Sequence, residues 1–257
     1  MVGHDAGDQL SIVAGTIARL DRDAPAYGVG RYNDFNTFYL QAASGTSGGS
    51  SGSPVVDIEG RVVALNAGGA TGAASSFYLP LGRVKRAVQL IRAGKPVPRG
   101  TLQTVFSYTP YDELRRLGLT AETEADTRKA FPDNTGMLVV DQIQPGSPAY
   151  SQLQTGDILI SVDGRSVTTF EPLEQLLDDS IGKPLTLSVQ RGGGLRSMQL
   201  EVSDLESITP ASYLEFGDAV VHDISYQQAR HFNLPIRGVY VANPGYSLAA
   251  AGVPVIA

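Results

Sequence analysis

The chain has 257 residues, of which 42% are hydrophobic and 18% are charged, and its formal net charge is −6. This composition predicts packed cores in one large domain or two smaller ones, and it offers no basic patch for nucleic acid or an anionic membrane surface. The chain contains no cysteine, which excludes disulfides and thiolate metal sites, and its three histidines are far apart in sequence. We therefore predict no metal, no cofactor and no nucleic-acid partner. No apolar run reaches the ~18 residues of a membrane span, so we predict no transmembrane segment.

Residues 9–94 have the pattern of strands and turns followed by one helix. Runs rich in β-branched and aromatic residues alternate with turn signals, such as the Asp-Arg-Asp-Ala-Pro of residues 21–25. Apolar residues with helical spacing follow at residues 83–93. Strands are expected at residues 11–20, 37–41, 55–65 (a hairpin that turns at 57–60) and 75–80. Together these segments predict a six-stranded β half-barrel closed by a helix.

A glycine- and serine-rich loop, Gly49-Ser50-Ser51-Gly52-Ser53-Pro54, runs directly into the predicted hairpin. Only small residues let a chain turn tightly enough for two backbone N–H groups to converge on one point, which is the geometry that stabilises an oxyanion. In this interpretation Ser51 is a nucleophile, and the amides of Gly49 and Ser51 form the oxyanion hole. A second frame, Gly45-Thr46-Ser47-Gly48-Gly49, makes Ser47 the alternative nucleophile. A Gly/Ser stretch is ordinarily a flexible linker, and the flanking strands favour the catalytic interpretation.

A short polar stretch that contains proline, residues 94–100, is a natural linker to a second module. We expect strands at 101–108 and 136–140, a short helix at 110–117, an amphipathic helix at 171–179 and a closing hairpin of 184–190 with 197–203.

Parts of this second module then recur along the chain. The run 111–119 is echoed at 226–234, the strand 136–140 at 238–242, and Pro145-Gly146 at Pro244-Gly245. The second copy stops before the strand, the helix and the hairpin that complete the first copy. We therefore expect the second copy to fold poorly by itself.

These pieces together resemble the HtrA/Do-type (Deg) serine proteases over nearly the whole chain. The resemblance is carried by residues 3–12, 32–37 and 45–54, by the linker residues 99–103, and by the repeated modules, which are similar to PDZ domains. It is closest to the large Do-like proteases of plants and fungi. It implies a mainly β fold with some α. Residues 1–94 would be the C-terminal half of a chymotrypsin-like (trypsin-like) β-barrel protease domain, 99–205 a PDZ domain, and 210–257 a truncated, incomplete second PDZ-like domain.

The resemblance also assigns binding residues. It implies a small apolar S1 pocket lined by Ala64, Leu65, Asn66, Phe77 and Tyr78. PDZ domains capture a C-terminal carboxylate in a backbone nest and pair the peptide as an added strand. The implied nest is Gly100, Thr101, Leu102 and Gln103, and the implied groove residues are Leu173, Leu176 and Leu177. The three leucines are equally expected as core residues, and Asp157 is expected to cap a turn rather than contact a ligand.

A serine nucleophile needs a base and an acid that orients the base. In the trypsin-like order both precede the serine. Here His4 is the only histidine before Ser51, and it lies in a loop that resembles a different part of the family. The preceding aspartates lack the context of the family's catalytic acid; they are Asp5, Asp8, Asp21, Asp23 and Asp34. We therefore expect a fragment, inactive alone, of an ATP-independent serine endopeptidase that degrades misfolded proteins. The alternative hypothesis is a non-catalytic PDZ adaptor that binds peptides. The implied partners are polypeptide substrates and C-terminal peptides; family members form homo-oligomers, and relatives suggest the chloroplast in plants or the nucleus in fungi.

Overall fold

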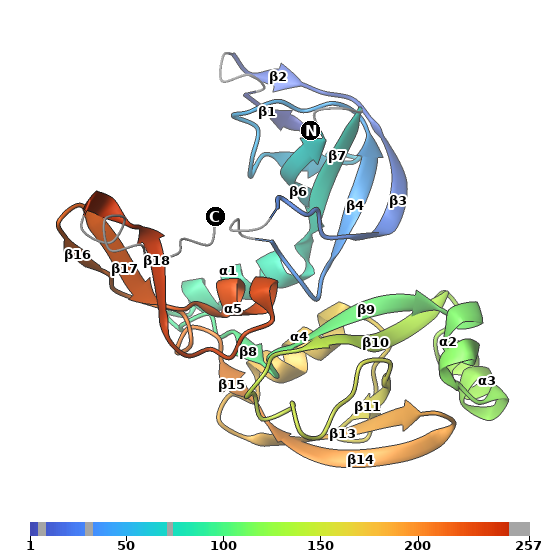
Figure 1. Cartoon of the computed structure of the whole chain (residues 1–257). Coiled ribbons are helices and arrows are strands. Elements are labelled where there is room, and N and C mark those ends of the chain that lie inside the picture. The colour runs from blue at the N-terminus through green and yellow to red at the C-terminus, as the bar shows by residue number, and fades with distance from the viewer. Residues whose placement is uncertain (5–8, 29–32, 71–73, 247–257) are drawn as a thin grey trace. The chain divides into compact units, whose positions relative to one another are not determined.

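A computed structural model describes residues 1–4, 9–28, 33–70 and 74–246. The chain divides into two compact units, one of Met1–Ala26 and Asn33–Val97 and one of Pro98–Ala257 with Tyr27–Tyr32. The boundary at residues 97 and 98 lies inside the stretch that the sequence marks as a linker. Most elements of both units are labelled in Figure 1. A further division of the second unit at residues 205–210 stays a prediction.

The first unit is built on one antiparallel sheet. The strand order is β3-β4-β7-β6-β5, and a separate pair is formed by β1 and β2. The elements are β1 (Val2–Gly3), β2 (Ser11–Ile12), β3 (Thr16–Asp23), β4 (Phe38–Ala43), β5 (Pro54–Val56), β6 (Val62–Ala70), β7 (Ser75–Pro80) and the helix α1 (Leu81–Arg92). The sequence predicts a half-barrel of six strands. The sheet instead has five, because β1 and β2 pair with each other.

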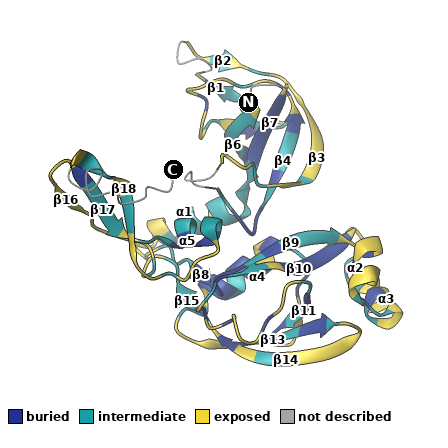
Figure 2. Cartoon of the chain, in the orientation of Figure 1, coloured by how far each residue is buried: buried dark blue, intermediate teal, exposed yellow. Residues whose placement is uncertain are grey.

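Alternation along these strands turns one face of the sheet into a core. The buried residues on that face are Met1, Ala42, Val55, Ala64 and Tyr78, with Val13 and Leu40 packed against them. The terminal strand β3 is different, because it is exposed along nearly its whole length (Figure 2). It also continues to Asp23 where the sequence predicts a turn, since Arg22 and Asp23 pair with β4. Strand pairing overrides the local turn signal there.

The predicted hairpin of β5 and β6 is confirmed, and Asp57 closes it. The Asp57 carboxylate accepts the backbone N–H groups of Glu59 at 3.0 Å and Arg61 at 2.9 Å, and the Arg61 Nε–H at 2.8 Å. Gly60 follows with φ of +79°, a conformation that glycine adopts without strain. The backbone bond from Arg61 is the main cause that lowers the pKa of Asp57. The turn is thus determined by local chemistry.

The second unit contains a complete five-strand path and a shorter three-stranded sheet. The larger sheet has the order β14-β13-β11-β10-β9, with β12 paired to β11 off this path. Strands β8 and β15 form a separate two-stranded sheet. Its elements are β8 (Gly100–Thr101), β9 (Thr104–Pro110), α2 (Tyr111–Leu117), α3 (Ala121–Ala130), β10 (Gly136–Ile143), β11 (Ile158–Val162), β12 (Arg165–Ser166), α4 (Phe170–Asp178), β13 (Pro184–Arg191), β14 (Gly194–Glu201) and β15 (Ser203–Asp204). The predicted strand at 101–108 is therefore interrupted at Leu102 and Gln103.

The sequence repeat is also a repeat of structure. The second copy has the elements β16 (Leu214–Phe216), β17 (Ala219–Asp223), α5 (Tyr226–Phe232) and β18 (Val239–Asn243). Gln103 and Asp218 both have positive φ, +53° and +62°, and Gln103 precedes Tyr111 by the same interval as Asp218 precedes Tyr226. Residues other than glycine rarely have a positive φ. The positive φ that Gln103 and Asp218 share therefore marks them as equivalent positions in the two copies. The strands predicted at residues 238–242 and the helix predicted at 226–234 are confirmed.

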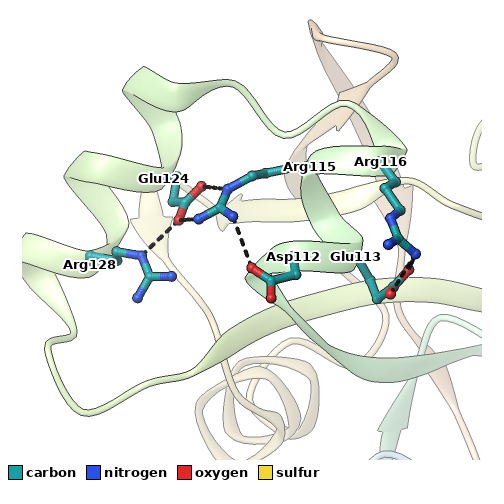
Figure 3. A network of polar contacts seen from close by, with 6 residues as sticks. All are labelled: Asp112, Glu113, Arg115, Arg116, Glu124 and Arg128. Atoms are coloured by element: carbon teal, nitrogen blue, oxygen red, sulfur yellow. Dashed lines mark hydrogen bonds and ion pairs between the residues drawn. The ribbon is translucent and has the colours of Figure 1, made fainter.

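Helix α3 was not expected from the sequence, and it is tied to α2 by a network of charges. Arg115 donates from Nε and Nη2 to the two carboxylate oxygens of Glu124, each at 2.7 Å, and Arg128 Nε donates to Glu124 at 2.8 Å. Figure 3 shows these contacts, with Asp112 joined to Arg115. The Arg128 guanidinium lies 3.8 Å from the centroid of the buried Tyr111 ring. The network therefore connects both helices to a core residue.

Glu124→Gln should remove most of the pH dependence that this network gives to the second unit. Hydrogen bonds from Arg115 lower the pKa of Glu124 from 4.5 to about 2. The ion pairs therefore stabilise the folded state above pH ~4.5, and this stability is lost as the pH falls toward 2. Between about pH 6 and about pH 2.5, we expect the free energy of unfolding to fall by roughly 1–3 kcal/mol more in the wild type than in the variant. Urea titration followed by circular dichroism measures this difference.

Glu113→Gln is the matched control, because Glu113 forms an exposed ion pair with Arg116, one turn further along α2. Exposed pairs contribute little, so this variant should keep the wild-type pH dependence. Parallel curves for the wild type and Glu124→Gln would show that the network does not stabilise the fold.

Candidate active site and peptide-binding nest

Ser51 lies in a tight turn that leads directly into β5. Gly49 and Gly52, on either side of it, have φ of +97° and +80°, in the region that only glycine enters without strain. Ser51 itself is exposed, and Ser50 beside it is fully buried. An alternation of buried and exposed residues in such a short stretch requires the chain to be held from one side. The loop therefore has a defined shape and is not a flexible linker.

Asn66 on β6 is the residue that holds this turn. Its side chain donates from Nδ2 to the Ser50 carbonyl at 2.9 Å. Its backbone carbonyl accepts the Gly52 N–H at 2.7 Å, and its backbone N–H donates to the Ser53 carbonyl at 2.9 Å. Asn66 is buried at 3% exposure, so these bonds are shielded from water. The three bonds together attach the serine-bearing turn to the sheet.

The alternative nucleophile, Ser47, is also exposed, but it lies before the Gly48-Gly49 turn and outside the bonds made by Asn66. The start of its segment is held by Ser44, which the sequence did not single out. Ser76 Oγ donates to the Ser44 carbonyl at 2.8 Å, and Ser44 Oγ lies 3.0 Å from the Tyr78 hydroxyl. All three side chains are buried. The assignment of the nucleophile and of the two oxyanion-hole amides stays a prediction.

The strand register does not bring the five predicted S1 residues together on one face. Asn66 is paired with Tyr78, and Leu65 with Leu79, so Leu65 points away from Ala64, Asn66 and Tyr78. Ala64 and Tyr78 belong to the buried core. Phe77 neighbours Tyr78 and therefore lies on the opposite face. The strand register therefore places these five residues on two faces of the sheet. The S1 pocket stays a prediction.

The structure describes two of the residues considered as a base or acid in detail, His4 and Asp34. His4 is exposed and follows β1, which lies against the loop, since a Cβ on Gly3 would lie 2.1 Å from Ser53 Oγ. The Asp34 carboxylate accepts hydrogen bonds from the Phe35 N–H and the Tyr39 hydroxyl, each at 3.0 Å. Asp5 and Asp8 lie outside the described residues. Among the described residues, no cluster of three or more His, Asp or Glu could hold a metal ion, and no helix there is long and apolar enough to cross a membrane.

The predicted carboxylate nest is enclosed in this structure. The Gly100 N–H donates to Asp178 Oδ1 at 2.9 Å, and the Gln103 N–H donates to Thr101 Oγ1 at 2.9 Å. Leu102 is only 2% exposed. A Cβ on Gly100 would lie 2.1 Å from the Leu177 carbonyl oxygen, so only glycine fits between β8 and α4. The amides of Gly100 and Gln103 thus bond groups of the chain itself, and the carboxylate nest stays a prediction.

The helix α4 forms as expected, but its leucines divide between two roles. Leu173 and Leu177 are fully buried, at 0% and 1% exposure, whereas Leu176 is partly exposed. The core interpretation therefore describes Leu173 and Leu177. Asp157 caps a turn as expected, accepting the Gln154 N–H at 2.8 Å, and it also binds Arg191 Nε at 2.6 Å.

Three domain families match parts of this chain. The trypsin-like peptidase domain matches residues 1–65, the PDZ domain matches residues 139–191, and the PDZ-like domain matches residues 207–254. The three matches follow one another in the order of the predicted peptidase segment and two PDZ-like modules. The trypsin-like match contains the Ser51 turn and most of its hairpin, the PDZ match contains α4, and the PDZ-like match contains the second copy of the repeat.

Curated relatives with this architecture are much longer than the chain. Protease Do-like 7 of Arabidopsis thaliana is 54% identical over 99% of this chain, which covers 24% of that protein. The pro-apoptotic serine protease NMA111 of Saccharomyces cerevisiae (strain ATCC 204508 / S288c) is 49% identical over 95% of the chain and 24% of the relative, and nma111 of Aspergillus terreus is 53% identical over 94% and 23%. The chain spans about a quarter of the length of these relatives.

Solved structures of HtrA-type proteases also resemble the chain. AlgW with a tripeptide is 20% identical, with a TM-score of 0.49 over 79% of this chain and 63% of that one.

Asn66→Ala should loosen the turn that carries Ser51. The variant loses the bond to the Ser50 carbonyl, which keeps the Ser53 N–H as a donor at 3.1 Å. We therefore expect a loss of about 0.5–1.5 kcal/mol in the free energy of unfolding of the first unit. Amide hydrogen exchange at Gly52 and Ser53 should become faster, because local opening of the turn costs less. Native-state exchange followed by mass spectrometry or NMR measures both effects.

Gln41→Ala is the control, since it removes a comparable side-chain bond, from Nε2 to Ser75 Oγ at 2.9 Å, elsewhere in the sheet. It should leave the exchange rate of Gly52 unchanged. An unchanged rate in Asn66→Ala as well would mean that other contacts hold the turn.

Proposed function

We propose that this chain supplies the nucleophile-bearing part of an HtrA/Do-like serine endopeptidase that degrades misfolded polypeptides without ATP. Ser51 is the nucleophile, and the amides of Gly49 and Ser51 form the oxyanion hole. The observation that carries the proposal is the turn at residues 50–53, which Asn66 attaches to the sheet while Ser51 stays exposed. The relatives that align with nearly the whole chain are named a protease and a pro-apoptotic serine protease, which supports the same reaction class.

In the proposed reaction, Ser51 Oγ attacks the carbonyl carbon of the scissile peptide bond and its proton passes to a base. The new C–O bond places negative charge on the carbonyl oxygen, which the two backbone N–H groups stabilise. The C–N bond then breaks, the amine leaves with the proton, and water hydrolyses the acyl-enzyme to restore Ser51. The turn contributes by fixing the nucleophile and the two donors relative to each other before substrate arrives.

We further propose that the base and its orienting acid come from outside these residues, so that the chain alone is inactive. His4 is exposed and resembles a different family segment, and Asp34 is already bonded to Tyr39. A serine without a base is an ordinary alcohol, and removal of any one member of such a set abolishes most of the rate enhancement. The PDZ-like part of the chain would bind the C-termini of polypeptide substrates and partners.

A fluorophosphonate probe, which labels activated serines, tests this proposal. We expect no labelling of the purified 257-residue chain and clear labelling of a form extended upstream through the same reading frame. In the extended form, Ser51→Ala should abolish labelling and Ser47→Ala should retain it. In the proposal only Ser51, in the turn that Asn66 attaches to the sheet, lies at the oxyanion hole. Labelling is read by gel fluorescence and the labelled peptide by mass spectrometry. Loss of labelling in Ser47→Ala with retention in Ser51→Ala would reverse the assignment of the nucleophile.

A non-catalytic peptide adaptor is the second candidate function. It is favoured by the larger sheet of the second unit, which ends in β9, a terminal strand to which an extended peptide can add. The same probe separates the two candidates. Absence of labelling in the extended form, together with retained peptide binding, would support the adaptor and contradict the protease.

A further inference from the structure

The second copy of the repeat covers the nest of the first copy. Helix α5 buries Tyr226, Ala229 and Arg230, at 3%, 0% and 9% exposure. Two glutamines near the end of β10 donate to backbone carbonyls of α5 and of the segment after it. Gln142 Nε2 donates to the Arg230 carbonyl at 2.7 Å, and Gln144 Nε2 donates to the Leu234 carbonyl. Just beyond the helix, a Cβ on Gly146 would lie 3.9 Å from Pro235. The contact therefore runs along residues 226–235.

Gln144 links this contact directly to the nest. Its backbone N–H donates to the Gln103 carbonyl at 3.0 Å, while its side chain bonds Leu234. Gln144 is 1% exposed and Gln103 is 8% exposed. A residue that bonds the nest with its main chain and α5 with its side chain makes the two surfaces neighbours. Gln144 thus joins Gln103 to the segment that directly follows α5.

Tyr226 reaches the other side of the nest. Its side chain lies close to the Thr101 side chain and to Glu174, and burial raises its pKa. Thr101 Oγ1 accepts the Gln103 N–H, which is a bond that the carboxylate of a peptide would make in a PDZ nest. Hydroxyl groups rotate and exchange partners readily. Thr101, held under Tyr226, thus occupies the donor that a ligand would use.

The charges beside the nest also act against an incoming carboxylate. Glu174 and Asp178 on α4 are buried and face Arg99, with Nη–O distances of 3.0 Å and 3.6 Å. Asp178 already accepts the Gly100 N–H at 2.9 Å. A ligand carboxylate would therefore have to be received at Leu102 and Gln103, the part of the nest that lies nearest to α5.

We propose that residues 224–235 are an intramolecular cap on the nest of the first PDZ-like module, and that a C-terminal peptide is captured there only when the cap is released. The inference rests on the peptide binding proposed above for this module. The apparent affinity of a site that is open for only a fraction of the time is reduced by that fraction. Any partner that holds the second copy elsewhere would therefore strengthen peptide binding without touching the nest.

The double variant Gln142→Ala/Gln144→Ala in the full 257-residue chain tests the cap. It removes both side-chain bonds to α5 and leaves the backbone bond between Gln144 and Gln103. The probe is a fluorescent octapeptide that ends in valine with a free carboxylate, measured by anisotropy beside the same peptide with a C-terminal amide. We expect about tenfold or more tighter binding of the free-carboxylate peptide than in the wild type, since two lost bonds shift such an equilibrium by about five- to a hundredfold. The amide should show no gain.

A second variant acts from the cap itself. Tyr226→Ala should produce the same gain, and amide exchange at Leu102 and Gln103 should become faster in both variants. Gln152→Ala is the matched control, because Gln152 Nε2 also donates to a backbone carbonyl, that of Gln199 at 3.2 Å, on an exposed part of the same module. It should bind the peptide as the wild type does. Circular dichroism and the urea midpoint of each variant show that the second unit remains folded.

Two results would overturn the cap, and they differ in what they say about peptide binding. Equal, measurable binding by the wild type and both variants would mean that peptide capture stands and α5 does not limit it. No binding by any form, with faster exchange at Gln103 in the variants, would mean that the opened nest does not capture carboxylates and that the proposed binding function fails as well.

Discussion

Hydrogen bonds from single polar side chains to the main chain of a distant loop determine the shape of both units. Buried backbone groups need partners, and loops cannot find them within a sheet ladder. In the first unit Asn66 supplies such a partner to Ser50. In the second unit Asp178 does so for Gly100, and Gln144 for Leu234. Each of these side chains is buried, so removing it takes a hydrogen bond from a backbone group in a place that water reaches poorly.

This constraint explains why the two predicted functional loops differ in access. The turn at residues 50–53 has its carbonyl groups bonded from the sheet side, which leaves Ser51 exposed on the other side. The loop at residues 100–103 is bonded by Asp178 of α4 and by the backbone of Gln144, whose side chain in turn bonds Leu234. The first arrangement suits a group that reacts with large substrates. The second suits a site whose access depends on the position of another part of the chain.

Much of the fold could be predicted from the sequence, and the failures have physical causes. The hairpin at residues 57–60, helix α4 and the repeat were predicted, because aspartate caps, apolar periodicity and self-similarity are local signals. Helix α3 was missed because it is almost entirely polar and has no apolar face to detect. The S1 prediction combined residues on opposite faces, since a bulge after Asn66 and the pairing of β6 with β7 decide the register. Groove and core were equally expected for Leu173 and Leu177, and the packing of α4 buries both.

The sequence by itself determined the features that depend on neighbours along the chain. These are the glycine-rich turn around Ser51, the Asp57 hairpin, the linker near residue 97 and the echo of Tyr111 in Tyr226. Only the tertiary structure decided which polar side chain meets which loop. Ser50 and Asn66, or Gln144 and Leu234, are far apart in sequence, and neither residue type names its partner. Strand register and helix packing bring such groups within hydrogen-bond distance, and that information is distributed over the whole core rather than written at either position.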